Sequence, residues 1–137
     1  MTYRFLPHTA DTLVALEADT LEGLFAEATT VVRILLAGDA AVREAQAHEV
    51  CINAASGDEL IHHYVRELLA EFQLDTFLPA RLDPTRLSPT ELVGVLWGEP
   101  FDQSRHEPQP EVKAVTWHGL CVRETESGWS ARFVLDL

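Results

Sequence analysis

The amino-acid sequence predicts an α+β fold: a mostly antiparallel or mixed β-sheet with two main helices packed on one face, in a single domain that spans residues 1–137. The length of 137 residues suits one domain with its own core. A hydrophobic content of 47% and a charged content of 23% are typical of a globular protein. The expected elements follow the order β-β-α-β-α-β-β-β-β, and so few helices cannot supply the crossovers that an all-parallel sheet requires.

The chain begins with two expected strands and a helix. Residues 3–6 and 12–18 have strand character. Asp19 is expected to cap a helix because Glu22 follows three residues later, and Gly38 is expected to end that helix. The apolar stripe of the helix comprises Leu21, Leu24, Phe25, Ala28, Val31, Val32, Leu35 and Leu36.

A third strand is expected within residues 41–54, and a second helix follows it. Ser56 and Glu59 have the spacing of a capping box, so this helix is expected to begin after Ser56. Its apolar face comprises Leu60, Ile61, Tyr64, Leu68, Leu69 and Phe72.

Two further strands are expected at residues 77–87 and 91–97, joined by a Ser-Pro-Thr turn. Pro79 and Pro84 indicate that the first of these strands lies at an edge or is broken, because proline cannot donate a ladder hydrogen bond. Residues 98–111 have no periodicity and contain several prolines. Long irregular loops of this kind inside a compact domain are often functional.

The last part of the chain is expected to be strand again. Residues 112–123 have strand character, and Gly119 indicates a bulge within them. Residues 129–137 form the final expected strand, with Trp129 and Phe133 on one face and Asp136 on the other.

The net charge of −12 limits the expected partners. An acidic surface repels phosphates, so no strong direct binding of nucleic acid is expected, whereas divalent cations and basic proteins are compatible partners. Acidity that serves solubility alone is the plainer alternative. The sequence shows neither a secretory signal nor an apolar run near the roughly 20 residues that span a bilayer. Cys51 and Cys121 have no metal-type spacing, so we expect reduced thiols in a cytoplasmic protein without a membrane segment.

Aspartates stand at the ends of two expected strands. Asp11 precedes the strand at 12–18 and Asp136 ends the final strand, although aspartate is depleted in strands. If the two strands are neighbours, these carboxylates and a backbone oxygen form a hard-oxygen site suited to Ca²⁺, Mg²⁺ or Mn²⁺. The alternative is that each aspartate merely caps the end of its element.

Other polar residues are weaker candidates for a site. His8 lies in the turn before the first core strand, where its ring is expected to bond to nearby backbone. Glu111 and Lys113 alternate onto one strand face, and an ion pair between them contributes little when exposed. His106 and His118 join a site only if the long loop folds back.

The residue pattern does not resemble that of a self-sufficient enzyme. His62 and His63 are adjacent on a helix, so they point in different directions and do not form a chelate; His62 is expected at a boundary and His63 in solvent. The sequence contains no nucleophile elbow, Gly-rich phosphate loop or paired Cys-x-x-Cys motif.

Three stretches together resemble the archease family. FLPHTADTLVALEADTLEGLF is similar to the family's opening turn, strand and helix; GEPFDQSRHEPQPEVKAVTWHGLCV is similar to its Gly-Glu-Pro-Tyr/Phe-Asp-x-x-Arg-His loop and following strand; GWSARFVLDL resembles its C-terminal strand. The resemblance covers the whole chain. Pro7 departs from the acidic or polar residue that usually precedes the histidine, so position 7 offers no carboxylate ligand.

The resemblance implies an accessory protein that activates the RtcB-type RNA ligase in tRNA splicing and RNA repair. That ligase uses GTP and Mn²⁺ through a guanylate on its own histidine, and archease is understood to promote guanylylation and repeated turnover. The family's metal ligands carry over onto Asp11, Asp136 and the backbone of Leu137, with Ca²⁺, Mg²⁺ or Mn²⁺ as the ion. Glu111 and Lys113 match a charged strand entrance that serves the same surface.

Two other functions stay open at this point. A stand-alone metal-dependent phosphoesterase needs a general base beside the metal and turns over without a partner. A chaperone-like protein-binding module protects unrelated clients and does not depend on Asp11.

Overall fold

The computed structural model describes residues 2–7 and 11–137, within which the chain forms two helices and eight strands. The helices are α1 (Leu21–Ala37) and α2 (Gly57–Asp75), and neither is long and apolar enough to cross a membrane. The strands are β1 (Thr2–Pro7), β2 (Asp11–Ala18), β3 (Gln46–Asn53), β4 (Phe77–Ser88), β5 (Glu91–Pro100), β6 (Ala114–Val115), β7 (Cys121–Thr125) and β8 (Gly128–Asp136). The α+β class predicted from the sequence is confirmed.

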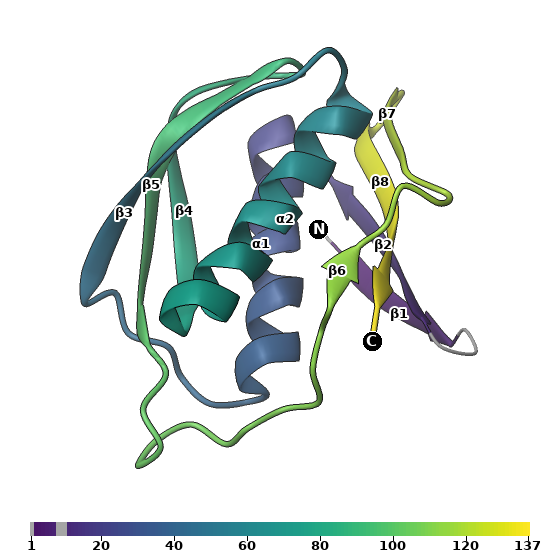
Figure 1. Cartoon of the computed structure of the whole chain (residues 1–137). Coiled ribbons are helices and arrows are strands. Elements are labelled where there is room, and N and C mark those ends of the chain that lie inside the picture. Colours follow the sequence, from purple (N-terminus) through teal and green to yellow (C-terminus); the bar gives the residue numbers. More distant parts are fainter. Residues whose placement is uncertain (1, 8–10) are drawn as a thin grey trace.

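The strands form two antiparallel sheets. A five-stranded sheet has the order β1-β2-β8-β6, with β7 also paired to β8, and a three-stranded sheet has the order β3-β5-β4. Both helices lie between the two sheets (Figure 1), where α1 contacts β4 on one side and β2 and β8 on the other. The helices therefore cover one face of each sheet, and the opposite face of the five-stranded sheet, here called the outer face, is left for other contacts.

The helix ends follow the capping signals closely. Ser56 caps α2 as predicted, because its Oγ accepts a hydrogen bond from the Glu59 N–H at 3.2 Å. The N-cap of α1 is Thr20 and not Asp19: Thr20 has extended backbone, and its Oγ1 accepts from the Gly23 N–H at 3.0 Å. Gly38 ends α1 as predicted, with a φ of 64° that favours glycine.

The core is formed by the facing stripes of both helices and the inner faces of both sheets. Phe25 and Tyr64 pack with ring centroids 5.4 Å apart. The Tyr64 hydroxyl lies 2.6 Å from the Thr29 Oγ1, so this buried phenol has a partner, and burial raises the pKa of Tyr64. Phe72 and Trp129 are only partly buried against this core.

The three-stranded sheet contains the irregular strand that its prolines predict. β4 is an edge strand, and its pairing with β5 shifts register between Pro79 and Arg81 and again between Pro84 and Arg86. Next to the first shift, the backbones approach so closely that a Cβ on Gly98 would lie 2.0 Å from the Leu78 carbonyl oxygen. Only glycine fits at this position of β5.

The single strand expected at residues 112–123 is two strands. β6 and β7 both pair with β8, on the edge opposite β2. Between them Gly119 has a φ of 67°, so it lies in a turn and not in a bulge. The turn allows the chain to leave β8 and return to it further along.

Candidate functional site

Asp11 and Asp136 are direct cross-strand partners. Asp11 begins β2, Asp136 ends β8, and the antiparallel register pairs them residue to residue. Side chains of directly opposed residues point to the same face, with Cβ atoms about 4.5–5.5 Å apart. Both aspartates are partly exposed. The structure thus brings together the two carboxylates that the sequence analysis selected, here called the carboxylate pair.

The alternation of the strands places the carboxylate pair on the outer face. In β2 the buried residues Val14 and Leu16 point toward the helices, so Asp11 points away from them. In β8 the buried residues Phe133 and Leu135 point inward, so Asp136 also points away. The pair therefore faces solvent at the end of the five-stranded sheet.

The segment that contains Lys113 lies directly beside Asp136. The Lys113 N–H donates to the Asp136 carbonyl oxygen at 2.8 Å, and Ala114 is the second register partner of Asp136. The Gln73 side chain of α2 donates to the Lys113 carbonyl oxygen at 3.0 Å. Lys113 and Glu111 are exposed. The backbone of Lys113 is thus fixed next to the carboxylate pair, and its side chain is free to extend into solvent.

Three further residues were predicted for the site: His118, Leu137 and His8. His118 is exposed in the turn after β6, where its N–H donates to the Thr116 Oγ1 at 3.2 Å. Leu137 follows Asp136 and is 40% exposed. His8 lies outside the described residues.

The carboxylate pair has the donor chemistry of an open metal site. Within residues 2–7 and 11–137, neither carboxylate forms an ion pair, and no group of three or more His, Cys, Asp or Glu side chains is arranged to hold a metal. Ca²⁺ takes about 6–8 oxygen ligands. Two carboxylates and a backbone oxygen of Leu137 fit such an ion in type but not in number, so water or a partner would supply the remaining ligands.

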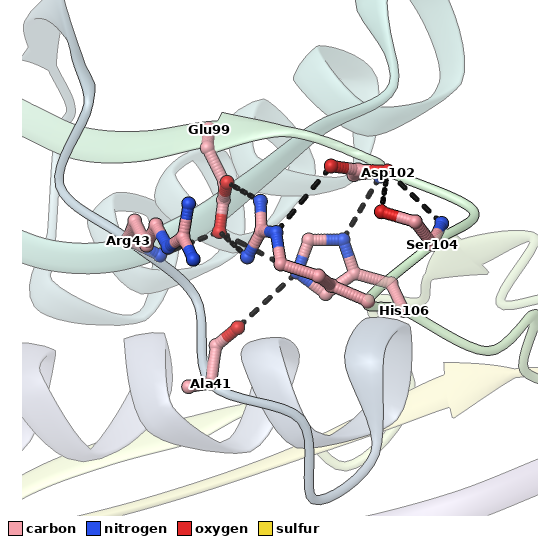
Figure 2. A network of polar contacts seen from close by, with 7 residues as sticks. Ala41, Arg43, Glu99, Asp102, Ser104 and His106 are labelled. Carbon is pink, nitrogen blue, oxygen red and sulfur yellow. Dashed lines mark hydrogen bonds and ion pairs between the residues drawn. The ribbon is translucent and has the colours of Figure 1, made fainter.

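A second polar cluster holds the long loop that follows β5 (Figure 2). Glu99 is 4% exposed and receives hydrogen bonds from both terminal nitrogens of Arg105 and, at 2.6 Å, from the Arg43 N–H. The pKa of Glu99 is lowered, and the hydrogen bond from the Arg105 guanidinium is the largest cause. This carboxylate is fully satisfied inside the protein, so it is not available to a ligand.

His106 completes the same cluster, because the loop does fold back. Its ring is buried; Nδ1 accepts from the Asp102 N–H at 2.9 Å, and Nε2 lies 3.2 Å from the Ala41 carbonyl oxygen. Since Nδ1 accepts, the proton of a neutral ring is on Nε2 and is donated to Ala41. Asp102 in turn accepts from the N–H and the hydroxyl of Ser104. His106 is therefore a structural residue of the loop.

The two adjacent histidines of α2 are more buried than the sequence predicted, which was His62 at a boundary and His63 in solvent. His62 is 3% exposed, and its ring stacks on the Trp117 ring with centroids 3.5 Å apart. Trp117 itself is 56% exposed, and His63 meets its edge. Burial, then the charges of Arg66 and His63, lower the pKa of His62. The helical pattern could not show this, because the residue that covers His62 lies far away in the sequence.

These features define the class of protein: a small α+β domain with helices between two antiparallel sheets, and a pair of accessible carboxylates where two strands end. The chain belongs to the Archease protein family (MTH1598/TM1083), whose family model matches residues 3–137. It is accordingly an archease-type accessory protein.

The sequence is similar to archeases of other organisms over almost its whole length. The protein archease of Methanopyrus kandleri is 35% identical over 142 residues, with 100% of both chains covered. The protein archease of Saccharolobus solfataricus is 29% identical over 136 residues, with 98% of both chains covered.

Two solved structures have the same fold. The solution structure of Methanobacterium thermoautotrophicum protein 1598 matches with a TM-score of 0.80 at 26% identity, covering 98% of each chain. The crystal structure of an archease from Thermotoga maritima, described as a possible chaperone, matches with a TM-score of 0.67 at 18% identity, covering 100% of this chain and 98% of its own.

Proposed function

We propose that this protein activates an RtcB-type RNA ligase in the cytoplasm, promoting guanylylation and repeated turnover of the ligase in tRNA splicing and RNA repair. The observation that carries the proposal is the register of Asp11 against Asp136, which places two carboxylates side by side on the outer face; among residues 2–7 and 11–137 neither has an ion-pair partner. Membership of the archease family supports an accessory role of this kind.

A divalent ion fits this role. Asp11, Asp136 and a backbone oxygen of Leu137 would hold Ca²⁺, Mg²⁺ or Mn²⁺, whose positive charge neutralises phosphate oxygens when the ion is bound. Because these residues supply only part of a coordination shell, they leave positions for oxygens of a second molecule. An open site of this kind is suited to an ion shared with a partner that binds GTP.

Charge supports the encounter with such a partner. The chain carries a net charge of −12, whereas the entrance of an active site that binds GTP and RNA phosphates is basic. Opposite charges accelerate association and orient the two molecules. Lys113, fixed beside Asp136, is proposed to contact the ligase at the same surface, with Glu111 and His118 flanking it. Activation requires that the surface bind the guanylylation-competent state of the ligase more tightly than other states.

The test is one round of guanylate transfer to the ligase, with wild-type protein or a variant added in catalytic amounts. Asp11→Ala and Asp136→Ala are each expected to abolish the stimulation, because the ion loses a ligand. Asp83→Ala is the matched control: it also removes one exposed aspartate, but from β4 in the other sheet. It is expected to stimulate as wild type does.

The alternative functions give different results in the same assay. A chaperone-like module would stimulate the ligase, or protect it from unfolding, without dependence on Asp11 or added metal. This outcome is worth measuring because the archease of Thermotoga maritima is described as a possible chaperone. A phosphoesterase would release phosphate from a substrate without the ligase. Full stimulation by both folded Asp→Ala variants would rule out the carboxylate mechanism.

A further inference from the structure

We propose that an apolar groove at the C-terminal ends of both helices receives a short segment of the protein partner, in which an aliphatic or aromatic residue is flanked by lysine or arginine. This inference deepens the proposed function and rests on it. The groove has a volume of about 430 Å³, within the range of roughly 300–1,000 Å³ usual for ligand pockets. Its apolar lining comprises Leu36, Phe72, Phe101, Pro108, Pro110 and Val112.

The groove offers burial to an apolar side chain. Leu36 comes from the last turn of α1 and Phe72 from the end of α2, while Phe101 and Val112 come from the two ends of the long loop. Phe72 and Phe101 are only partly buried, so apolar surface remains for a partner to cover. Removing such surface from water stabilises a complex by about 25 cal/mol per Å² before the costs of association.

The charge around the groove selects a cation beside that side chain. Both helices direct their negative dipole ends toward it, and neither has a basic residue in its last turn. Glu111 lines the groove and Asp75 ends α2. Lys113, the nearest basic residue along the lining segment, is not part of the lining. An acidic peptide or a fatty-acid carboxylate would therefore be repelled, and a basic peptide is favoured.

The walls of the groove are already fixed before a partner binds. The cluster of Glu99, Arg105 and His106 holds the start of the loop (Figure 2), and the Phe101 N–H donates to the Thr76 carbonyl oxygen at 2.8 Å. Pro108 and Pro110 each fix the φ angle of their own residue in the part of the long loop that lines the groove. Little ordering cost then opposes binding.

The groove lies close to the carboxylate pair along the chain. Val112 lines the groove, and the next residue, Lys113, donates its N–H to the Asp136 carbonyl oxygen at 2.8 Å. One partner can therefore contact both surfaces at once. The groove would supply affinity, and the carboxylate pair would supply the effect on the ligase.

The first experiment measures association with the ligase and stimulation separately. Pro108→Arg adds a positive charge at an exposed position of the rim, and Phe72→Ala removes the aromatic floor. Each is expected to weaken association about tenfold or more and to retain full stimulation once the ligase is saturated. The controls are Pro89→Arg in the β4–β5 turn and Leu74→Ala, an 82% exposed apolar residue outside the lining; both should associate as wild type does.

The outcomes distinguish this inference from the proposed function. Folded groove variants that associate as tightly as wild type would overturn the groove, even if Asp11→Ala still abolishes stimulation. A wild-type protein that neither associates with the ligase nor stimulates it would overturn the proposed function.

A second experiment tests the groove without the ligase. The probe is a synthetic peptide with a Leu-Phe pair between two lysines on each side, compared with the same peptide carrying glutamates. In amide NMR titrations the basic peptide is expected to shift the resonances of Phe72, Phe101 and Val112, and the acidic peptide to leave them unchanged. Unmoved resonances with the basic peptide, or equal shifts with both, would overturn the inference.

Discussion

The carboxylate pair and the Glu99 cluster are both acidic, but their carboxylates have opposite surroundings. Glu99 is buried, paired with Arg105 and bonded to backbone, so every oxygen is used inside the protein. Asp11 and Asp136 lie side by side on the outer face, and neither forms an ion pair within the described residues. A satisfied carboxylate holds the fold, whereas an unsatisfied pair at a surface is available for a ligand.

The largest loss of stability is expected for a substitution in the core, and it is the reference against which the two acidic regions are judged. Leu68 is 0% exposed between the helices and sheets. Leu68→Ala should lower the free energy of unfolding by roughly 2–5 kcal/mol, because it leaves a cavity. Urea unfolding followed by circular dichroism measures this. A loss below about half a kcal/mol would show that α2 is not packed as described.

Glu99→Ala should have the next largest effect on stability. The substitution leaves the Arg105 guanidinium and the Arg43 N–H without their shared acceptor, so a loss of about 2–3 kcal/mol is expected. Since the pKa of Glu99 is lowered from 4.5, wild type should lose this contribution only as the pH falls below that value toward the folded-state pKa. Unfolding curves for both proteins across acidic pH test the prediction, and parallel pH profiles would contradict it.

A smaller effect is expected from His62 near neutral pH. Its pKa is lowered from 6.5, so the unfolded chain takes up a proton at a higher pH than the folded chain does. Stability should therefore be full above about pH 6.5 and should decrease as the pH falls below it. His62→Phe keeps a ring against Trp117 but removes the titration. Denaturant midpoints at about pH 7.5 and about pH 5.5 should differ less in this variant than in wild type.

The smallest change in stability is expected at the carboxylate pair. Asp11→Asn keeps the shape of the side chain and removes one of two neighbouring negative charges, so the free energy of unfolding should change by no more than about 0.5 kcal/mol. Thermal unfolding measures this without metal. Stimulation of the ligase should nevertheless be lost. A large destabilisation would mean that Asp11 is structural, like Glu99, and the contrast between the two regions would disappear.

Local patterns predicted the helices and most strands well. Capping boxes and apolar stripes act within a few residues, so α2 begins at Gly57 after its Ser56 cap, and α1 ends at Gly38. The division into two sheets could not be predicted, because strand alternation shows which face is buried and not which strand is the neighbour.

The candidate site was predictable only in part. Aspartates at strand ends stood out because aspartate is rare in strands, and the register brings Asp11 and Asp136 together. Whether they share an ion stays a prediction. The closure of Glu99 on Arg105 and the stacking of His62 on Trp117 had no signal in spacing, because each depends on how a loop returns to the fold.

The pairing of β2 with β8 also determines when the carboxylate pair comes into existence. It joins residues 11 and 136, near opposite ends of the described chain, so it closes one of the longest loops in the fold. Contacts of such high sequence separation are slow to form during folding. A partly folded molecule therefore lacks the proposed working surface, and immature chains would not compete with native ones for the ligase.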